Sequence, residues 1–95
     1  MPYFVVNSYH GPAWIEERAM RDQDGWPAHR DFMNALPPGF VFLGGPVAGH
    51  RRAMLLVKAS DLAEVHRRLD PDPWVRSGHL VEVIEPWEIL LGDPP

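Results

Sequence analysis

The sequence contains no cysteine, and this absence excludes several kinds of chemistry at once. Without thiols the chain can form no disulfide, no thiolate metal site and no cysteine nucleophile. It also lacks any apolar run near the roughly 18–20 residues of a membrane span, and it opens without a signal-peptide pattern. Internal repeats at solenoid periods and low-complexity segments are absent as well. We therefore expect a cytoplasmic protein.

Positive charge is also scarce in this chain. Nine lysines and arginines stand against 13 acidic residues, which gives a net charge of −4 at pH 7. This balance argues against nucleic-acid binding, which usually needs a basic face. The 45% of hydrophobic and 23% of charged residues are ordinary for a globular protein. We expect one domain over residues 1–95, a size at which a partner subunit adds useful stability.

Eleven prolines and eight glycines divide the chain into short elements. Apolar and β-branched segments predict four strands, at 3–9, 40–43, 53–57 and 80–91. Helical spacing of apolar residues predicts one helix from Pro27 and a second from Asp61 to about residue 69, where 70–73 ends it. The order βαββαβ predicts a ferredoxin-like α+β fold, with a four-stranded antiparallel sheet and both helices on one face.

The predicted strands carry apolar residues at consecutive positions, for example at 4–6, 40–43 and 53–57. Both faces of the sheet are then apolar, but two helices can cover only one of them. We therefore expect a homodimer that packs sheet against sheet with two-fold symmetry. The alternative is that residues 10–25 or the C-terminal tail fold over the second face. The pattern leaves open whether Phe4 or Val5 points outward.

Familiar catalytic motifs find little support in this chain. His29-Arg30-Asp31 matches the kinase catalytic-loop tripeptide by chance, because the other kinase motifs are missing. Gly44-Gly45-Pro46 is not a phosphate loop, since no lysine or serine follows at the required spacing. The five histidines form no i, i+4 pair, so we expect no metal site and place most of them at the surface.

His29 stands apart from the other histidines because it falls in the first turn of a predicted helix, on the same stripe as Met33 and Leu36. The predicted topology also brings Ser8, residues 44–46 and residues 70–73 to the same end of the sheet. A histidine, carboxylates, a hydroxyl and free backbone N–H groups meet there, which favours a small-molecule site. A purely structural role for His29 stays open.

Several segments, in order and over nearly the whole chain, resemble the YciI-like (YCII-related) family. The matching segments are Tyr3 to Val6, Pro27-Ala28-His29, Gly39-Phe40-Val41 with Gly44-Gly45-Pro46, Asp72-Pro73-Trp74-Val75, Ser77-Gly78, and Glu85-Pro86-Trp87 to Gly92.

The resemblance implies a dimeric α/β-barrel made of two ferredoxin-like subunits. It also implies an active site with a histidine and an aspartate, which carry over to His29 and Asp72, with Asp70 as the rival carboxylate. Many members have arginine where this chain has Trp26. This difference suggests an apolar or aromatic ligand surface in place of an anion-binding one. A few relatives, such as a dehydrochlorinase of hydroxyquinone breakdown and the muconolactone isomerases, act on small ring compounds.

Two kinds of function follow from these observations. The first is a cofactor-free enzyme for proton transfer, elimination or hydrolysis on a small cyclic or aromatic metabolite. His29 would be its general base and Asp72 the orienting partner. The expected substrate contacts are Ser8, Trp26, Gly45, Pro46 and Trp74. The alternative is a non-catalytic dimeric module that binds a metabolite or modulates a partner enzyme, and a third reading is a dimerisation domain without a ligand.

Overall fold

The computed structural model describes all 95 residues of the chain. Its elements follow in the order β1 (Tyr3–His10), the 3-10 helix η1 (Met20–Asp22), α1 (Trp26–Asn34), β2 (Val41–Pro46), β3 (Arg52–Lys58), α2 (Leu62–Leu69), α3 (Pro73–Ser77) and β4 (Leu80–Trp87).

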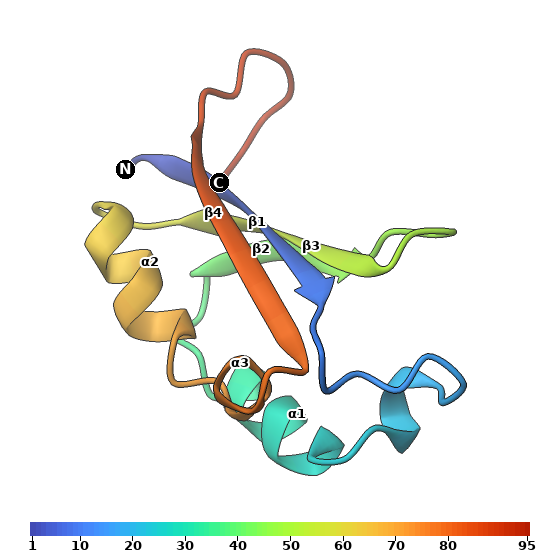
Figure 1. The fold of residues 1–95 in the computed structure, drawn as a ribbon. Helices are drawn as coiled ribbons and strands as arrows, with labels where there is room; N and C mark the ends of the chain where they lie inside the picture. The colour runs from blue at the N-terminus through green and yellow to red at the C-terminus, as the bar shows by residue number, and fades with distance from the viewer.

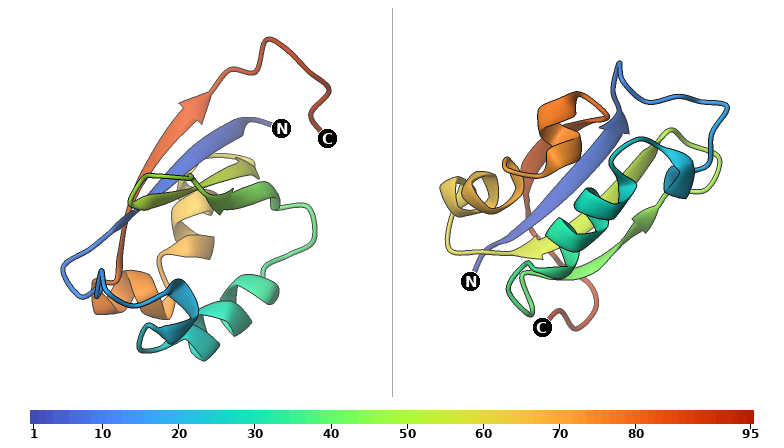
Figure 2. Two further views of the ribbon diagram at one scale, coloured as in Figure 1. Left: turned by 90° about the vertical axis from the view of Figure 1, so that its right-hand side faces the viewer. Right: turned by 90° about the horizontal axis from the view of Figure 1, so that it is seen from below.

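The four strands form one antiparallel sheet in the order β2-β3-β1-β4 (Figure 1). The helices lie on one side of this sheet, and the other side is free of helices (Figure 2). This arrangement confirms the predicted ferredoxin-like fold. None of the helices has the length and hydropathy that crossing a membrane requires.

Several element boundaries differ from the sequence prediction. Strand β2 runs from Val41 to Pro46 instead of ending at residue 43, because residues 44–46 pair with β3. Residues 70–73 end α2, but they also begin the short helix α3, because Asp72 caps its N-terminus and Pro73 occupies its first turn. Strand β4 stops at Trp87 instead of residue 91. The reason lies in its neighbour: Trp87 pairs with Tyr3, the first residue of β1, so the chain beyond it has no strand to pair with.

Helix α2 begins as its capping residues predict. The Asp61 side chain accepts a hydrogen bond from the backbone N–H of Glu64 at 2.8 Å. The Glu64 carboxylate reaches back one residue further than the standard motif and accepts from the backbone N–H of Ser60 at 2.7 Å. Buried Val65 and Leu69 then carry the apolar face of α2 onto the sheet.

The hydrophobic core lies between the sheet and the helices. Phe4 and Val6 of β1 point into it, beside their partners Val57 and Leu55 on β3. Side chains alternate along a strand, so Val5 points to the outer face, which settles the orientation that the sequence left open. The core cluster consists of Phe4, Val6, Phe40, Leu55, Val57, Ala59, Val65 and Leu69.

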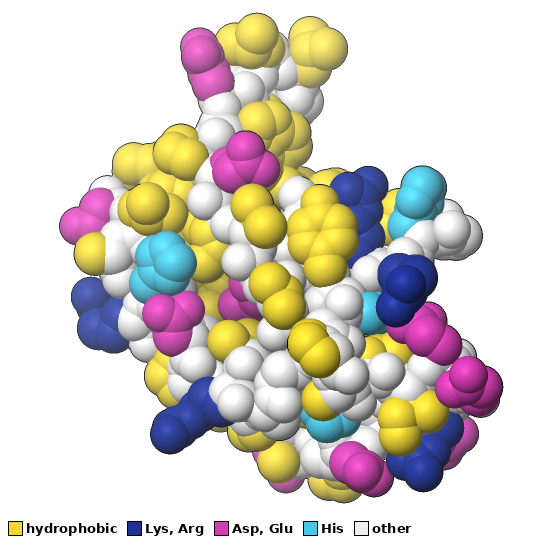
Figure 3. All heavy atoms as spheres, in the orientation of Figure 1, with side chains coloured by type: hydrophobic (Ala, Val, Ile, Leu, Met, Phe, Trp, Pro, Cys, Tyr) yellow, Lys and Arg dark blue, Asp and Glu magenta, His cyan; other side chains and the backbone are white.

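The outer face of the sheet keeps several large apolar side chains in contact with solvent. The exposed ones on the strands are Tyr9, Leu43, Met54, Val81, Val83 and Trp87. Figure 3 shows hydrophobic side chains over β4 and on the C-terminal segment above it.

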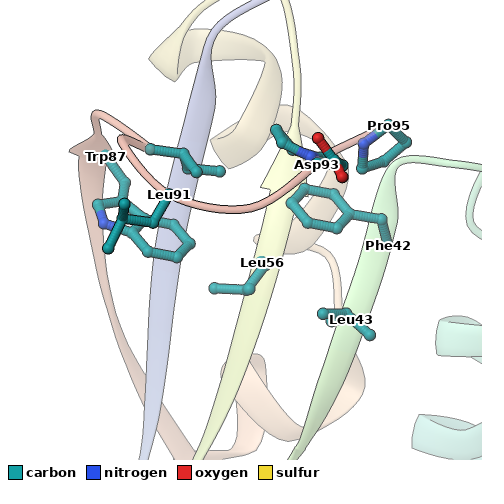
Figure 4. Close-up of a pocket in the computed structure, with 9 residues that line it drawn as sticks. Phe42, Leu43, Leu56, Trp87, Leu91, Asp93 and Pro95 are labelled. Carbon is teal, nitrogen blue, oxygen red and sulfur yellow. The ribbon is translucent and has the colours of Figure 1, made fainter.

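The C-terminal segment, residues 88–95, folds back over one end of this outer face (Figure 4). The Tyr3 hydroxyl donates a hydrogen bond to the backbone carbonyl of Pro95 at 2.6 Å. A hollow of about 370 Å³ lies between the segment and the strands, lined by Phe42, Leu56 and Trp87 among others. The segment therefore covers part of the face, whereas residues 11–25 lie beside α1 and leave it open (Figure 1).

Gly11 fixes the start of the 11–25 loop against the end of α3. Its backbone N–H donates to the carbonyl of His79 at 2.8 Å. A Cβ at this position would lie 2.2 Å from the carbonyl oxygen of Gly78, a backbone atom that cannot rotate away.

We therefore expect Gly11→Ala to lower the free energy of unfolding by about 1–3 kcal/mol, because the added methyl group forces the two segments apart. Gly45→Ala is the matched control, since a Cβ there meets no atom within 4 Å. Urea unfolding of both variants measures the difference. Equal stability of the two variants would contradict the close approach.

Candidate functional site

A cavity of about 440 Å³ lies at the end of the sheet where β1 and β2 finish, between the 11–25 loop, α1 and α3. Its wall is rich in aromatic and imidazole rings, from His10, Trp14, Trp26, His29 and Trp74. Backbone and small side chains at Gly45, Pro46 and Ala53 complete part of the wall. Such a volume is typical of a small-molecule pocket.

His29 and Asp72 are in direct contact beside this cavity. The His29 Nδ1 atom lies 2.9 Å from Oδ1 and 2.8 Å from Oδ2 of Asp72. The aspartate is 2% exposed and the histidine side chain 13% exposed. Because an ionised carboxylate only accepts hydrogen bonds, Nδ1 carries the proton and donates it. The other ring nitrogen, Nε2, is then free to accept a proton from a ligand.

Local sequence places both partners of this pair. Gly25, with a φ of 80°, turns the chain into α1, and Pro27 suits the first turn of that helix. The backbone N–H of His29 bonds to the Gly25 carbonyl at 3.0 Å, which sets the histidine one turn into the helix. Asp72 starts α3 and also accepts the backbone N–H of Trp74 at 2.9 Å. Two helix beginnings thus meet at one hydrogen bond.

Trp74 is the centre of the aromatic wall. Its ring stacks on that of His29, with centroids 4.1 Å apart and planes 11° from parallel. Trp14 meets Trp74 edge to face at 5.3 Å, and Trp26 lies 5.7 Å from it. The Trp74 indole N–H donates to the carbonyl of Asp24 at 2.8 Å, so its polar atom is satisfied although the residue is buried.

Histidines contribute more to this region than the sequence indicates: His10, His29 and His50 line the cavity, and His79 lies next to Trp74 outside its wall. His10 stacks on Trp14 with centroids 3.9 Å apart, and the buried His79 lies 5.7 Å from Trp74. The expectation that most histidines lie at the surface is therefore wrong, since only His50 and His66 are exposed. That His10, His29 and His79 lie next to tryptophans could not be read from sequence spacing.

Gln23 holds the loop that forms one side of the cavity. It is buried, and its amide makes three hydrogen bonds to the loop backbone. The side-chain oxygen accepts from the N–H of Ile15 at 2.9 Å, and the NH₂ group donates to the carbonyls of Ile15 and Arg18 at 2.6 and 3.1 Å. A buried amide of this kind gives an irregular loop a fixed shape.

The structure brings most of the predicted site residues together. Trp26, Gly45, Pro46 and Trp74 line the same cavity as His29. Their roles toward a ligand stay predictions.

Two residues of the sequence prediction lie elsewhere. Ser8 is buried, is not part of the cavity wall, and donates to a carboxyl oxygen of Glu82 at 3.0 Å. The predicted contact of Ser8 with a substrate therefore finds no support, because strand alternation turns it into the interior. Asp70, the rival carboxylate, is exposed, and its Oδ1 lies 3.3 Å from Nδ1 of His66 and not at His29.

Glu82 is the residue that sequence reasoning missed. Burial raises its pKa from 4.5 to about 7; the nearby carboxylates of Asp72 and Asp70 act in the same direction, whereas the Ser8 hydrogen bond and His29 oppose them. Its second oxygen, Oε1, is buried without a hydrogen-bond partner. The sequence signal that could have found it is strand alternation, because Glu82 lies between Leu80 and Ile84 on the inward positions of β4, which are otherwise apolar.

Comparisons with known proteins identify the fold. No protein-family model matches the chain, and no curated protein matches its sequence. Among solved structures, it is similar to 5-chloro-2-hydroxyhydroquinone dehydrochlorinase from Burkholderia phenoliruptrix AC1100, in complex with 2,5-dihydroxybenzoquinone. The TM-score is 0.69 and the identity 21%, over 90% of this chain and 93% of the other. The likeness supports the ferredoxin-like fold described above.

The raised pKa of Glu82 predicts a pH-dependent stability. Between pH 4.5 and about 7 the unfolded chain loses the Glu82 proton while the folded state keeps it. The free energy of unfolding should therefore fall over this range, by on the order of 3 kcal/mol at most, and then level off. Glu82→Gln should remove this contribution and be more stable than the wild type above pH 7. Urea unfolding at a series of pH values measures it.

Glu85→Gln is the control, because Glu85 lies on the same strand but is exposed on the outer face. It should keep the wild-type pH dependence. The same fall in stability in Glu82→Gln as in the wild type would show that Glu82 ionises normally in the folded protein.

Proposed function

We propose that the protein is a cytoplasmic member of the YciI-like family that acts on a compact planar ring compound without a bound cofactor. The main observation behind this proposal is the environment of the His29 imidazole. Nδ1 of His29 is held by a buried carboxylate, and the ring lies in the wall of an aromatic cavity. This arrangement is that of a general base whose tautomer is fixed by its partner.

The shape and lining of the cavity support a planar ligand. Three tryptophans surround about 440 Å³, a space suited to a single substituted ring. Aromatic walls favour flat, polarisable ligands through stacking. The similar dehydrochlorinase is in complex with 2,5-dihydroxybenzoquinone, a compound of this size and shape.

The proposed step is proton removal by Nε2 of His29. In an elimination, Nε2 takes a proton from the ligand, the electrons of the broken bond form a double bond, and a leaving group departs with its own bonding pair. Asp72 stabilises the imidazolium that forms, and it keeps the ring oriented. Trp74, stacked on the same ring, prevents the imidazole from turning away from the ligand.

His29→Gln tests the base directly. It should lower turnover of a converted ring compound by a factor of about 100 or more, with ligand affinity changed only a few-fold. Asp72→Asn should cost on the order of tenfold or more, because Nδ1 loses its charged acceptor. A thermal-shift screen of hydroxylated quinones and related ring compounds, followed by absorbance assays of turnover, supplies the measurement.

His66→Gln is the control, since His66 is exposed on α2 and is not part of the cavity wall. It should behave as the wild type. Unchanged turnover in His29→Gln would show that His29 is not the general base. Binding without conversion in the wild type would favour the non-catalytic metabolite-binding module instead.

We also propose a homodimer through the outer face of the sheet. The support is the row of exposed apolar side chains there, which the C-terminal segment covers at one end only. A second copy of the same face would bury the remainder.

Val5→Lys tests this dimer. Val5 lies on the outer face between Leu56 and Glu85, so a lysine there stays solvated in a monomer but is buried in the proposed interface. Sedimentation at micromolar protein should give a dimer for the wild type and a folded monomer near 10.8 kDa for the variant. Phe4→Lys should instead unfold the chain, because Phe4 is in the core. A monomeric wild type would rule the dimer out.

A further inference from the structure

Glu82 lies on the inner face of the sheet, where the charges of His29 and Asp72 act on it. It stands opposite Ser8 across β1 and β4, and its Oε2 accepts the Ser8 hydroxyl at 3.0 Å. Strand β4 packs against both α2 and α3, the helices on either side of Asp72. The strand that carries Glu82 therefore packs against both helices that flank the aspartate.

The second oxygen of Glu82 makes this carboxyl unusual. Oε1 is buried and has no hydrogen-bond partner. An ionised carboxylate with an unpaired oxygen in a buried place is costly, whereas the protonated form costs much less. No lysine or arginine compensates its charge; the groups that act on it are Ser8 from β1, His29 from α1, and Asp70 and Asp72 from the connection between α2 and α3.

We infer that Glu82 is a third, proton-holding member of the His29–Asp72 site, and that its charge controls the affinity of the site for anionic ring ligands. The second part rests on the proposed function. When Glu82 is protonated, Asp72 is the one carboxylate facing the imidazole. When Glu82 loses its proton to solvent, a second negative charge acts on the site beside that of Asp72 and repels an anionic ligand. Glu82 is thus a positioning residue that acts through charge and does not touch the ligand.

The burial that raises the pKa of Glu82 to about 7 puts this change in the neutral range. The two partners in the pair have opposite effects on it, since Asp72 disfavours the ionised form and His29 favours it. Removing Asp72 and removing His29 should therefore shift the pKa of Glu82 in opposite directions, and each shift can be measured separately.

Carbon-13 NMR of the Glu82 side-chain carboxyl tests the coupling without any ligand. The wild-type signal should titrate near pH 7. Asp72→Asn should move its midpoint down, and His29→Gln should move it up, each by a resolvable fraction of a unit. Glu85→Gln, on the outer face of the same strand, should leave it unchanged. A wild-type midpoint near 4.5, or one that ignores both partner variants, would overturn the inference.

The effect on ligands is tested with 2,5-dihydroxybenzoquinone, whose hydroxyl groups ionise to spread negative charge over the ring. Calorimetric affinities at pH 6 and pH 8 are compared between wild type and Glu82→Gln, so that ionisation of the probe cancels. From pH 6 to 8 the wild type should lose on the order of tenfold in affinity relative to the variant. An equal change in both proteins would overturn control by Glu82. A probe that does not bind counts against the proposed function, while the carboxyl titration still decides the coupling.

Discussion

The buried carboxylate of Asp72 is the interaction on which the rest of the site depends. At 2% exposure a charged group is stable only when its oxygens are satisfied, and Asp72 uses both helices that meet at the cavity to achieve this. Its carboxylate caps α3 by accepting the backbone N–H of Trp74, and it also accepts a hydrogen bond from His29 of α1. One side chain therefore starts a helix, holds two helices together and fixes the tautomer of the imidazole.

The aromatic cluster gives that hydrogen bond its fixed geometry. Trp74 follows the cap by two residues, which places its ring against the imidazole that the same cap residue binds. Its indole N–H is tied to the loop at Asp24, and the loop in turn is held in shape by the buried amide of Gln23. The surrounding rings have little polarity and keep water away from His29 and Asp72. The attraction between the imidazole and the carboxylate is therefore stronger than it would be in water. The Asp72 cap, the stacking of Trp74 on His29 and the loop held by Gln23 therefore depend on one another.

Much of the fold could be predicted because it depends on local signals. Glycine and proline mark the ends of elements, and β-branched runs and helical spacing identify their type, so the order βαββαβ and its topology were accessible. The start of α3 was missed because proline at 73 reads equally as a terminator or as a first helical residue. Only the packing of the downstream tryptophan decides between the two.

The site was predictable in part for a similar reason. His29 and Asp72 were singled out by position and by family pattern, but the surroundings of the pair depend on contacts between distant segments. Trp14 and His79 join the aromatic cluster from a loop and a strand end that no spacing rule links to α1. Glu82 was overlooked because an acidic residue within a strand reads as solvent-facing unless the inward parity is known.

Strand parity also separates the candidate site from the exposed outer face of the sheet. On β4 the residues Leu80, Glu82 and Ile84 face the helices, whereas Val81 and Val83 face outward. Ser8 and Val5 divide in the same way on β1. A slip of one residue in the β1–β4 register would exchange the two sets, exposing the core and burying the outer row. The register that builds the core therefore also turns the Ser8–Glu82 contact toward the helices and leaves the apolar row on the opposite face exposed.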